Sequence, residues 1–162
     1  MAKIAVVEDN DAMREQLCGF IAQYGRQLDV TAFADGAEIV DPYRPGFDII
    51  FLDIEMPTLG GMPTAERIRQ LDPDVVLVFV TNMAQYAIRG YEVDALDFVL
   101  KPVSYYQFST KLERALQRIQ RRAEVALTHR RKIALVSAVQ RRHFHQHKAV
   151  FEADLRIVVA AP

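Results

Sequence analysis

The chain has 162 residues, half of them hydrophobic and a quarter charged, which excludes a disordered or fibrous protein and fits one well-packed domain. Its longest apolar run, Val75 to Val80, has six residues and is far short of the roughly 18 that a membrane-spanning helix needs. Glu8 interrupts the apolar N-terminus too early for a secretory signal, and the single Cys18 cannot form an internal disulfide, so we expect a cytoplasmic protein.

The net charge of −1 hides an asymmetry along the chain. Residues 1–120 carry 11 Lys and Arg against 18 Asp and Glu, whereas residues 121–162 carry 9 against 3. An acidic body with a basic tail is typical of a cation-binding or phosphate-handling module joined to a segment that meets a polyanion. A solvated charged face explains the tail equally well.

Five short apolar runs, rich in β-branched residues, recur along the first two thirds of the chain. They cover residues 3–7, 28–33, 47–52, 75–80 and 97–100. Because the runs are nearly continuous in apolar residues, they indicate strands buried on both faces, as in a parallel sheet.

The segments between these strands predict helices. Residues 11–24 place apolar side chains at three- and four-residue spacings, and Gly25 follows as a stop. Pro63 suits the first position of a helix over 63–71. A longer helix is expected from near Ser104 to about Leu127.

Strands that alternate with helices favour an α/β fold, a doubly wound parallel sheet with helices on both faces. Ligands of such folds bind beyond the carboxyl ends of the strands. Functional residues are therefore expected directly after each strand.

Acidic, hydroxyl and basic side chains follow four of the five predicted strands. They are, in chain order, Glu8, Asp9, Asp53, Thr81 and Lys101. Each is common at a strand end when taken singly, because acids cap helices and Thr favours strands. Their occurrence together at one predicted sheet edge is what indicates a site.

The three carboxylates of this set need a cation. At about 5 Å and an effective dielectric near 20 they would repel by roughly 3 kcal/mol per pair. Oxygen ligands without a competing Cys or His set point to Mg²⁺ rather than zinc. Asp53 is then placed to act as a nucleophile on a phosphoryl group, while Thr81 and Lys101 contact the phosphoryl oxygens.

At these residues the sequence resembles the receiver domain of two-component response regulators, over about residues 2–120. The matching motifs are "ED" at 8–9, "LDIEMP" at 52–57, "GG" at 60–61, "FVT" at 79–81 and "DFVLKP" at 97–102. Residues 79–116 look most like receivers of the LytTR group of transcription regulators. The resemblance implies a five-stranded sheet of order 2-1-3-4-5.

The resemblance also implies the role of each site residue. Asp53 would accept the phosphoryl group, and Mg²⁺ would be held by Asp9, Asp53 and the backbone carbonyl of Glu55, with Glu8 acting through water. Thr81 and Phe98 would form the switch. Phe98 has a second interpretation as plain core.

The resemblance further implies a sensor histidine kinase as partner, and a homodimer through the fourth helix, fifth strand and fifth helix. Residues 1–122 would form the receiver and residues 123–162 a basic extension. LytTR relatives carry a DNA-binding domain of a size that 40 residues do not provide, and its pattern is not found here. DNA binding therefore rests on kinship alone.

The extension allows several interpretations. Its basic residues, which could contact phosphates, are Arg121, Arg122, Arg130, Arg131, Lys132, Arg141, Arg142 and Lys148. His143, His145 and His147 share one face if they lie on a strand, which would suit a metal. Three short strands after residue 131, or a remnant of an effector domain, are further alternatives.

Three other functions remain open from the sequence. The chain could be a receiver that acts by protein interaction alone. Asp53 and Glu55 resemble the D-x-D pair of haloacid-dehalogenase-like phosphohydrolases, although an acidic pair precedes them and Pro57 replaces the usual Thr or Val. A flavodoxin-like cofactor carrier is disfavoured because no phosphate-binding loop follows the first strand.

Overall fold

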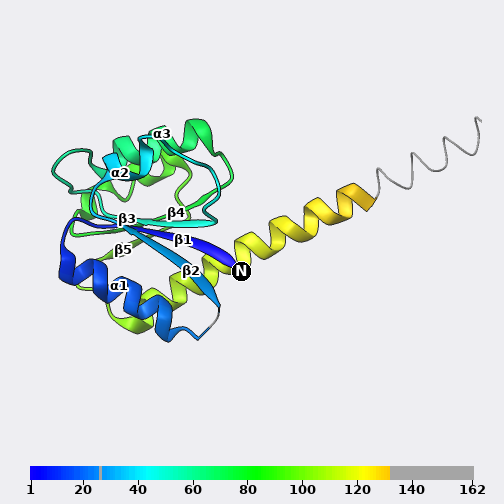
Figure 1. Cartoon of the computed structure of the whole chain (residues 1–162), viewed down its shortest axis with the longest axis horizontal. Helices are drawn as coiled ribbons and strands as arrows, with labels where there is room; N and C mark the ends of the chain where they lie inside the picture. The colour runs from blue at the N-terminus through cyan, green and yellow to red at the C-terminus, as the bar shows by residue number, and fades with distance from the viewer. Residues whose placement is uncertain (26, 132–162) are drawn as a thin grey trace, which may run out of the picture. The chain divides into compact units, whose positions relative to one another are not determined.

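The computed structural model describes residues 1–25 and 27–131. Within them five parallel strands form one sheet of order β2-β1-β3-β4-β5, with helices on both faces (Figure 1). The strands are β1 (Ala2–Val7), β2 (Leu28–Phe33), β3 (Ile49–Leu52), β4 (Val76–Thr81) and β5 (Asp97–Leu100). The predicted fold class and strand order are confirmed.

The central strands bury alternate residues on opposite faces of the sheet. On one face, Ile4, Phe51 and Val78 pack against α1 (Asp11–Gln23) and the last helix. The other face joins residues such as Leu52 to α2 (Gly36–Val40) and α3 (Gly61–Leu71). These two faces are why the strands read as continuous apolar runs.

Helix α1 begins at a side-chain cap, whereas α3 begins without one. The Asn10 side chain accepts from the Met13 amide and caps α1 directly after the first strand end. Helix α3 starts at Gly61, two residues earlier than the expected start at Pro63. Pro63 still lies in the first turn, where a missing N–H costs nothing.

The expected fourth helix is absent as an α-helix. Two 3-10 segments, η1 (Ala84–Tyr86) and η2 (Arg89–Val93), connect β4 to β5 instead. Gly90, a poor helix former, is buried there, and the Arg69 side chain donates a hydrogen bond to the Val93 carbonyl at 3.0 Å. A left-handed Asp94 then ends the segment. The predicted dimer surface therefore contains 3-10 turns where a helix was expected.

The last helix begins at residue 105 and continues through 131, beyond the expected end near Leu127. Ser104 and Gln107 hydrogen-bond each other's amides, a capping box that explains the start. Phe108, Leu112 and Leu116 pack this helix against the sheet. By internal contacts the chain divides into the units Met1–Ile119 and Gln120–Pro162.

The predictions for residues 132–162, including the three strands and the histidine cluster, lie outside the described residues. None of the helices in the described ranges combines the length and the apolar character that crossing a membrane requires.

Candidate functional site

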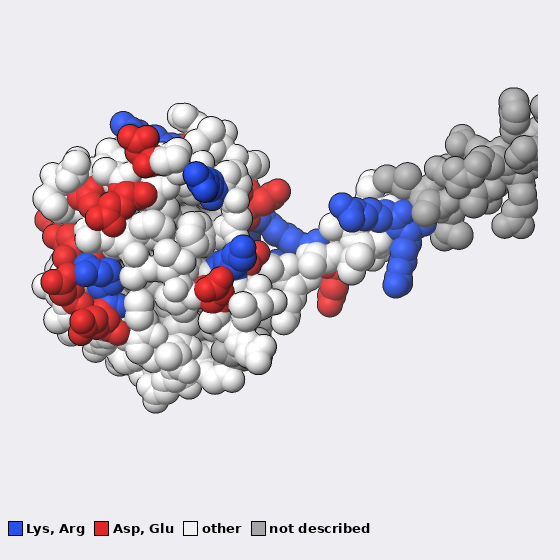
Figure 2. All heavy atoms as spheres, in the orientation of Figure 1, with Lys and Arg blue, Asp and Glu red and all other residues white. Residues whose placement is uncertain are grey.

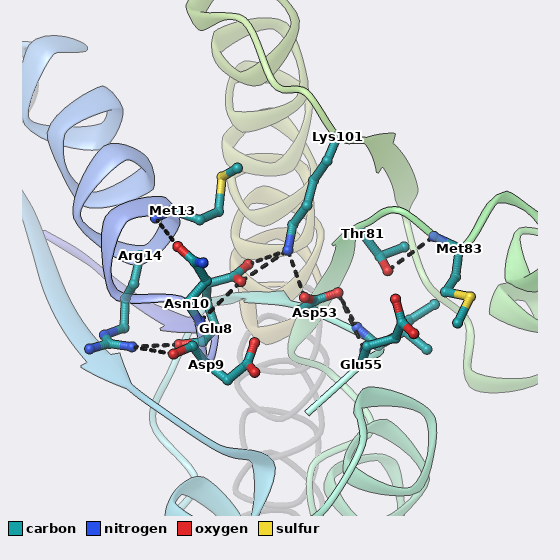
Figure 3. Close-up of polar contacts among 11 residues, drawn as sticks. Glu8, Asp9, Asn10, Met13, Arg14, Asp53, Glu55, Thr81, Met83 and Lys101 are labelled. Atoms are coloured by element: carbon teal, nitrogen blue, oxygen red, sulfur yellow. Dashed lines mark hydrogen bonds and ion pairs between the residues drawn. The ribbon is translucent and has the colours of Figure 1, made fainter. Parts of the chain in front are cut away.

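The carboxyl ends of three strands bring four predicted residues together (Figure 3). Glu8 and Asp9 follow β1, Asp53 follows β3, and Lys101 follows β5. One carboxylate oxygen from each of the three acids lies within 4.8 Å of the others. The unit Met1–Ile119 carries many of its acidic side chains at the end opposite the N-terminus (Figure 2). The three strands finish at this same end.

Lys101 forms ion pairs with two of these acids. Its Nζ lies 2.6 Å from Oδ2 of Asp53 and 2.8–2.9 Å from the two carboxylate oxygens of Glu8. Burial lowers the pKa of Lys101, but the hydrogen bonds to Asp53 and Glu8 outweigh it and raise the pKa above its usual value. The ammonium is therefore charged at neutral pH.

Glu8 is the most buried of the acids, at 1% exposed. Burial raises the pKa of its carboxyl, an effect that the hydrogen bond from Lys101 opposes. Its Oε2 is the one buried side-chain oxygen or nitrogen of the described residues without a hydrogen-bond partner. The 2.8 Å approach of Lys101 to this oxygen is an ion pair without hydrogen-bond geometry. Glu8 therefore retains an unused acceptor.

These features fit a hard divalent cation. The three acids offer only oxygen, Asp9 is exposed, and the buried Glu8 carries the unused acceptor. Mg²⁺ prefers carboxylate and carbonyl oxygens and keeps several waters. The site therefore has the donor chemistry that Mg²⁺ requires.

Asp53 is held by backbone as well as by Lys101. Its Oδ1 accepts from the amides of Ile54 at 2.6 Å and Glu55 at 3.4 Å. Among the described residues, Lys101 is the hydrogen-bond donor to its Oδ2. The two oxygens of Asp53 therefore have different hydrogen-bond donors: backbone amides hold Oδ1, and the Lys101 ammonium faces Oδ2.

The acids border an open cleft of about 720 Å³. Glu55, Asn82 and Pro102 also line it, together with the first turn of α1. The cleft is larger than one phosphoryl group needs, so a donor group has room to approach Asp53.

Thr81 and Phe98 lie outside the ionic cluster. Thr81 is fully buried, and its hydroxyl accepts from the Met83 amide at 3.2 Å. In Figure 3 it is drawn on the side of Asp53 away from Glu8. Phe98 is partly buried, with its ring 6.0 Å from that of Phe79. Their switching role stays a prediction.

Sequence reasoning missed two residues that hold the surrounding loops. Arg14 donates to the carbonyl of Glu8 at 2.7 Å and to that of Asp9 at 3.4 Å, and also pairs with Asp11. Asp35 follows β2, the strand end that carried no prediction, and accepts from amides of the loop after Asp53. An Asp directly before Gly36 at a strand end was the available signal.

Residues 4–113 match the family model described as the response regulator receiver domain. The chain belongs to this family. The transcriptional regulatory protein YpdB of Escherichia coli is 31% identical to this receiver over 130 residues, which cover 78% of this chain and 53% of YpdB. The sensory transduction protein LytT of Oceanobacillus iheyensis is 30% identical over 114 residues, which cover 68% of this chain and 46% of LytT. The predicted kinship with LytTR-type regulators is thus confirmed.

Solved receiver structures agree with the fold. The response regulatory domain of MrkE from Klebsiella pneumoniae matches with a TM-score of 0.68 and 27% identity, covering 74% of this chain and 98% of its own. TrrA from Thermotoga maritima, solved in complex with Mg²⁺-BeF, matches with a TM-score of 0.64 and 26% identity, covering 71% and 99%. The chain spans about half the length of the curated relatives it matches.

Proposed function

We propose that this receiver is a phosphorylation-controlled switch in which Asp53 accepts a phosphoryl group from a sensor histidine kinase. The observation that carries the proposal is the Asp53 carboxylate at a strand end, with the Lys101 ammonium 2.6 Å away and two further acids beside it. The family match and the TrrA structure in complex with Mg²⁺-BeF support it.

The transfer uses the oxygen that the backbone does not hold. Oδ2 of Asp53 bonds to phosphorus while the P–N bond to the kinase histidine breaks, and the imidazole nitrogen keeps that electron pair. Oδ1 stays on the amides of Ile54 and Glu55, so the carboxylate keeps its orientation. Lys101 then meets the new phosphoryl oxygens as a charged donor.

The residues that would hold Mg²⁺ are Asp9, Asp53 and the backbone carbonyl of Glu55, with Glu8 acting through water. When bound, the ion offsets negative charge on the phosphoryl oxygens. Arg14 supports this set because it donates to the backbone carbonyls of both Glu8 and Asp9.

The switch begins at Thr81. Phosphorylation adds a charge of about −1.5 to −2 and three acceptor oxygens. The Thr81 hydroxyl, a potential donor whose oxygen now accepts from the Met83 amide, turns toward those oxygens. Phe98 moves into the space that Thr81 leaves, and the surface of η1, η2, β5 and the last helix changes.

The output of the switch is transcription regulation, by analogy with the names of YpdB and LytTR relatives. Dimerisation through η1, η2, β5 and the last helix would couple phosphorylation to transcription regulation. We place the protein in the cytoplasm. A mobility-shift assay with and without phosphorylation tests DNA binding. No retardation in either state leaves protein interaction as the output.

Intact mass after treatment with a small phosphodonor and Mg²⁺ tests the acceptor. We expect one phosphoryl group on the wild type, none on Asp53→Asn, and one on Glu55→Gln, because the proposal uses only the carbonyl of Glu55. Equal labelling of wild type and Asp53→Asn would remove Asp53 from its role. Continuous turnover of phosphate esters would instead favour the phosphohydrolase alternative.

A further inference from the structure

A second carboxylate, outside the cleft, is buried beside the loop that follows Asp53. Asp35, between β2 and α2, is 7% exposed. Its Oδ1 accepts from the amides of Ala37 at 2.8 Å and Leu59 at 3.0 Å, and its Oδ2 accepts from that of Thr58 at 2.8 Å. A single carboxylate thus joins two connections that are more than 20 residues apart.

Two of these donors, the amides of Thr58 and Leu59, belong to the loop that follows Glu55. A second anchor closes the same loop, where the Gly61 amide donates to the Ile54 carbonyl at 2.9 Å. Glu55 lies between the two anchors, so the position of its carbonyl depends on both.

The two connections are also in close contact. A Cβ added at Gly36 would overlap the Leu59 carbonyl oxygen and the Thr64 hydroxyl. That hydroxyl donates to the Gly60 carbonyl at 2.8 Å. The loop after Glu55 therefore cannot shift toward α2, and Asp35 prevents the opposite movement.

Asp35 holds the loop as an anion. Burial alone would raise the pKa of its carboxyl, but the amides of Ala37, Thr58 and Leu59 outweigh burial and hold it below the usual value. An ionised acceptor makes each of these hydrogen bonds stronger than a neutral one would.

We infer that Asp35 is a positioning residue for cation binding: through the amides of Thr58 and Leu59 it fixes the loop that offers the Glu55 carbonyl to Mg²⁺. This inference rests on the proposed function, because that function assigns the carbonyl as a ligand. Asp35 itself contacts neither the cation nor the phosphoryl group.

Two substitutions separate positioning from simple stability. Asp35→Ser keeps a good cap for α2 but is too short to reach Thr58 and Leu59 together. Asp35→Asn keeps one acceptor oxygen and loses the other. Glu38→Gln is the matched control, because it removes a neighbouring charge that accepts from the Ala34 amide and not from the loop.

The first measurement is the Mg²⁺ dissociation constant of the full chain, from amide chemical shifts during titration with Mg²⁺ alone. We expect Asp35→Ser to weaken binding about tenfold, as loss of a residue behind a metal ligand commonly does. Asp35→Asn should lie between Asp35→Ser and the wild type, and Glu38→Gln should match the wild type.

The second measurement is amide hydrogen exchange over residues 54–60 without Mg²⁺. Exchange should be faster in both Asp35 variants than in the wild type and Glu38→Gln, while the exchange of β3 and β4 stays unchanged. If Asp35→Ser does not fold, Asp35→Asn decides the question alone.

Unchanged Mg²⁺ affinity in the Asp35 variants, beside a wild type that binds Mg²⁺, would overturn the inference and leave the proposed function standing. A wild type that does not bind Mg²⁺ would instead contradict the cation part of the proposed function. In that case unchanged exchange over 54–60 in the variants would overturn the positioning role, and faster exchange confined to this loop would support it.

Discussion

Lys101 stabilises the acidic site before any cation or phosphoryl group binds. Its ammonium lies between two buried carboxylates and is itself largely buried, at 9% exposed. A buried charge that loses its partner commonly costs several kcal/mol. The same lysine therefore supports the fold and the proposed chemistry.

Replacing Lys101 by Met should consequently lower the free energy of unfolding by about 3 kcal/mol at pH 7 without Mg²⁺, since Glu8 and Asp53 would face each other unpaired. Urea unfolding measures this loss. Lys111→Met is the control, because Lys111 is 31% exposed and should cost about 1 kcal/mol or less. A loss at Lys101 no larger than at Lys111 would contradict the assigned role.

The acids and the lysine could be predicted because each directly follows a strand, and parallel strands end at one sheet edge. The place of Asp35 after a strand was an available signal, but the roles of Asp35 and Arg14 could not be predicted in this way. Their partners are backbone amides and carbonyls, which any residue provides, so the sequence around the partners carries no signal.

At the scale of elements, the start of α3 is packed directly against the site. A Cβ at Gly61, the first residue of α3, would overlap the Asp53 carbonyl oxygen. Only glycine lets the helix begin so close to the strand end. The "GG" motif therefore has a steric reason that its place in a loop did not reveal.

Gly61→Ala should destabilise the protein by about 2–3 kcal/mol, because backbone must move to make room. Gly19→Ala is the matched control: Gly19 lies inside α1 with nothing within 4 Å of an added Cβ, and alanine there should stabilise by up to about 1 kcal/mol. Thermal unfolding of both variants checks this. Equal effects at both positions would show that the close approach is not present.

Asp97 links β5 to the last helix. Asp97 accepts from Lys111 at 2.8 Å and from Arg114 at 2.7 Å. Burial alone would raise the pKa of Asp97, but the bonds from Lys111 and from the Phe98 amide outweigh it and lower the pKa. The ionised form is thus favoured by folding.

Because the folded pKa of Asp97 lies below the unfolded value of about 3.9, its stabilisation is present above that value and is lost as pH falls through the folded pKa. Asp97→Asn should cost about 1 kcal/mol at pH 7, and this difference should shrink below about pH 4. Urea unfolding from pH 7 to pH 3 measures it, with Asp29→Asn at an exposed position of β2 as control. A difference that stays constant with pH would contradict the link.

The element between β4 and β5 shows where pattern reasoning fails. The alternation of strands and helices and the family resemblance implied a helix there, but the structure has 3-10 turns. Arg69 donates to carbonyls at 72, 73, 75, 93 and 94, and contacts between such distant segments outweigh local helix preference.

For the whole molecule, the doubly wound fold followed from alternating strands and helices, the strand order was implied by the family resemblance, and both are confirmed. The acidic site unit and the basic residues after 120 remain the largest contrast in charge along the chain. The proposed function therefore depends most on whether the acidic edge accepts a phosphoryl group at Asp53.

Peptide mapping of the full chain after treatment with a phosphodonor and Mg²⁺ tests this most directly. We expect one phosphoryl group on the peptide that contains Asp53, lost on treatment with hydroxylamine as an acyl phosphate is, and absent without Mg²⁺. A label on another peptide, a label that survives hydroxylamine, or no label at all would contradict the account.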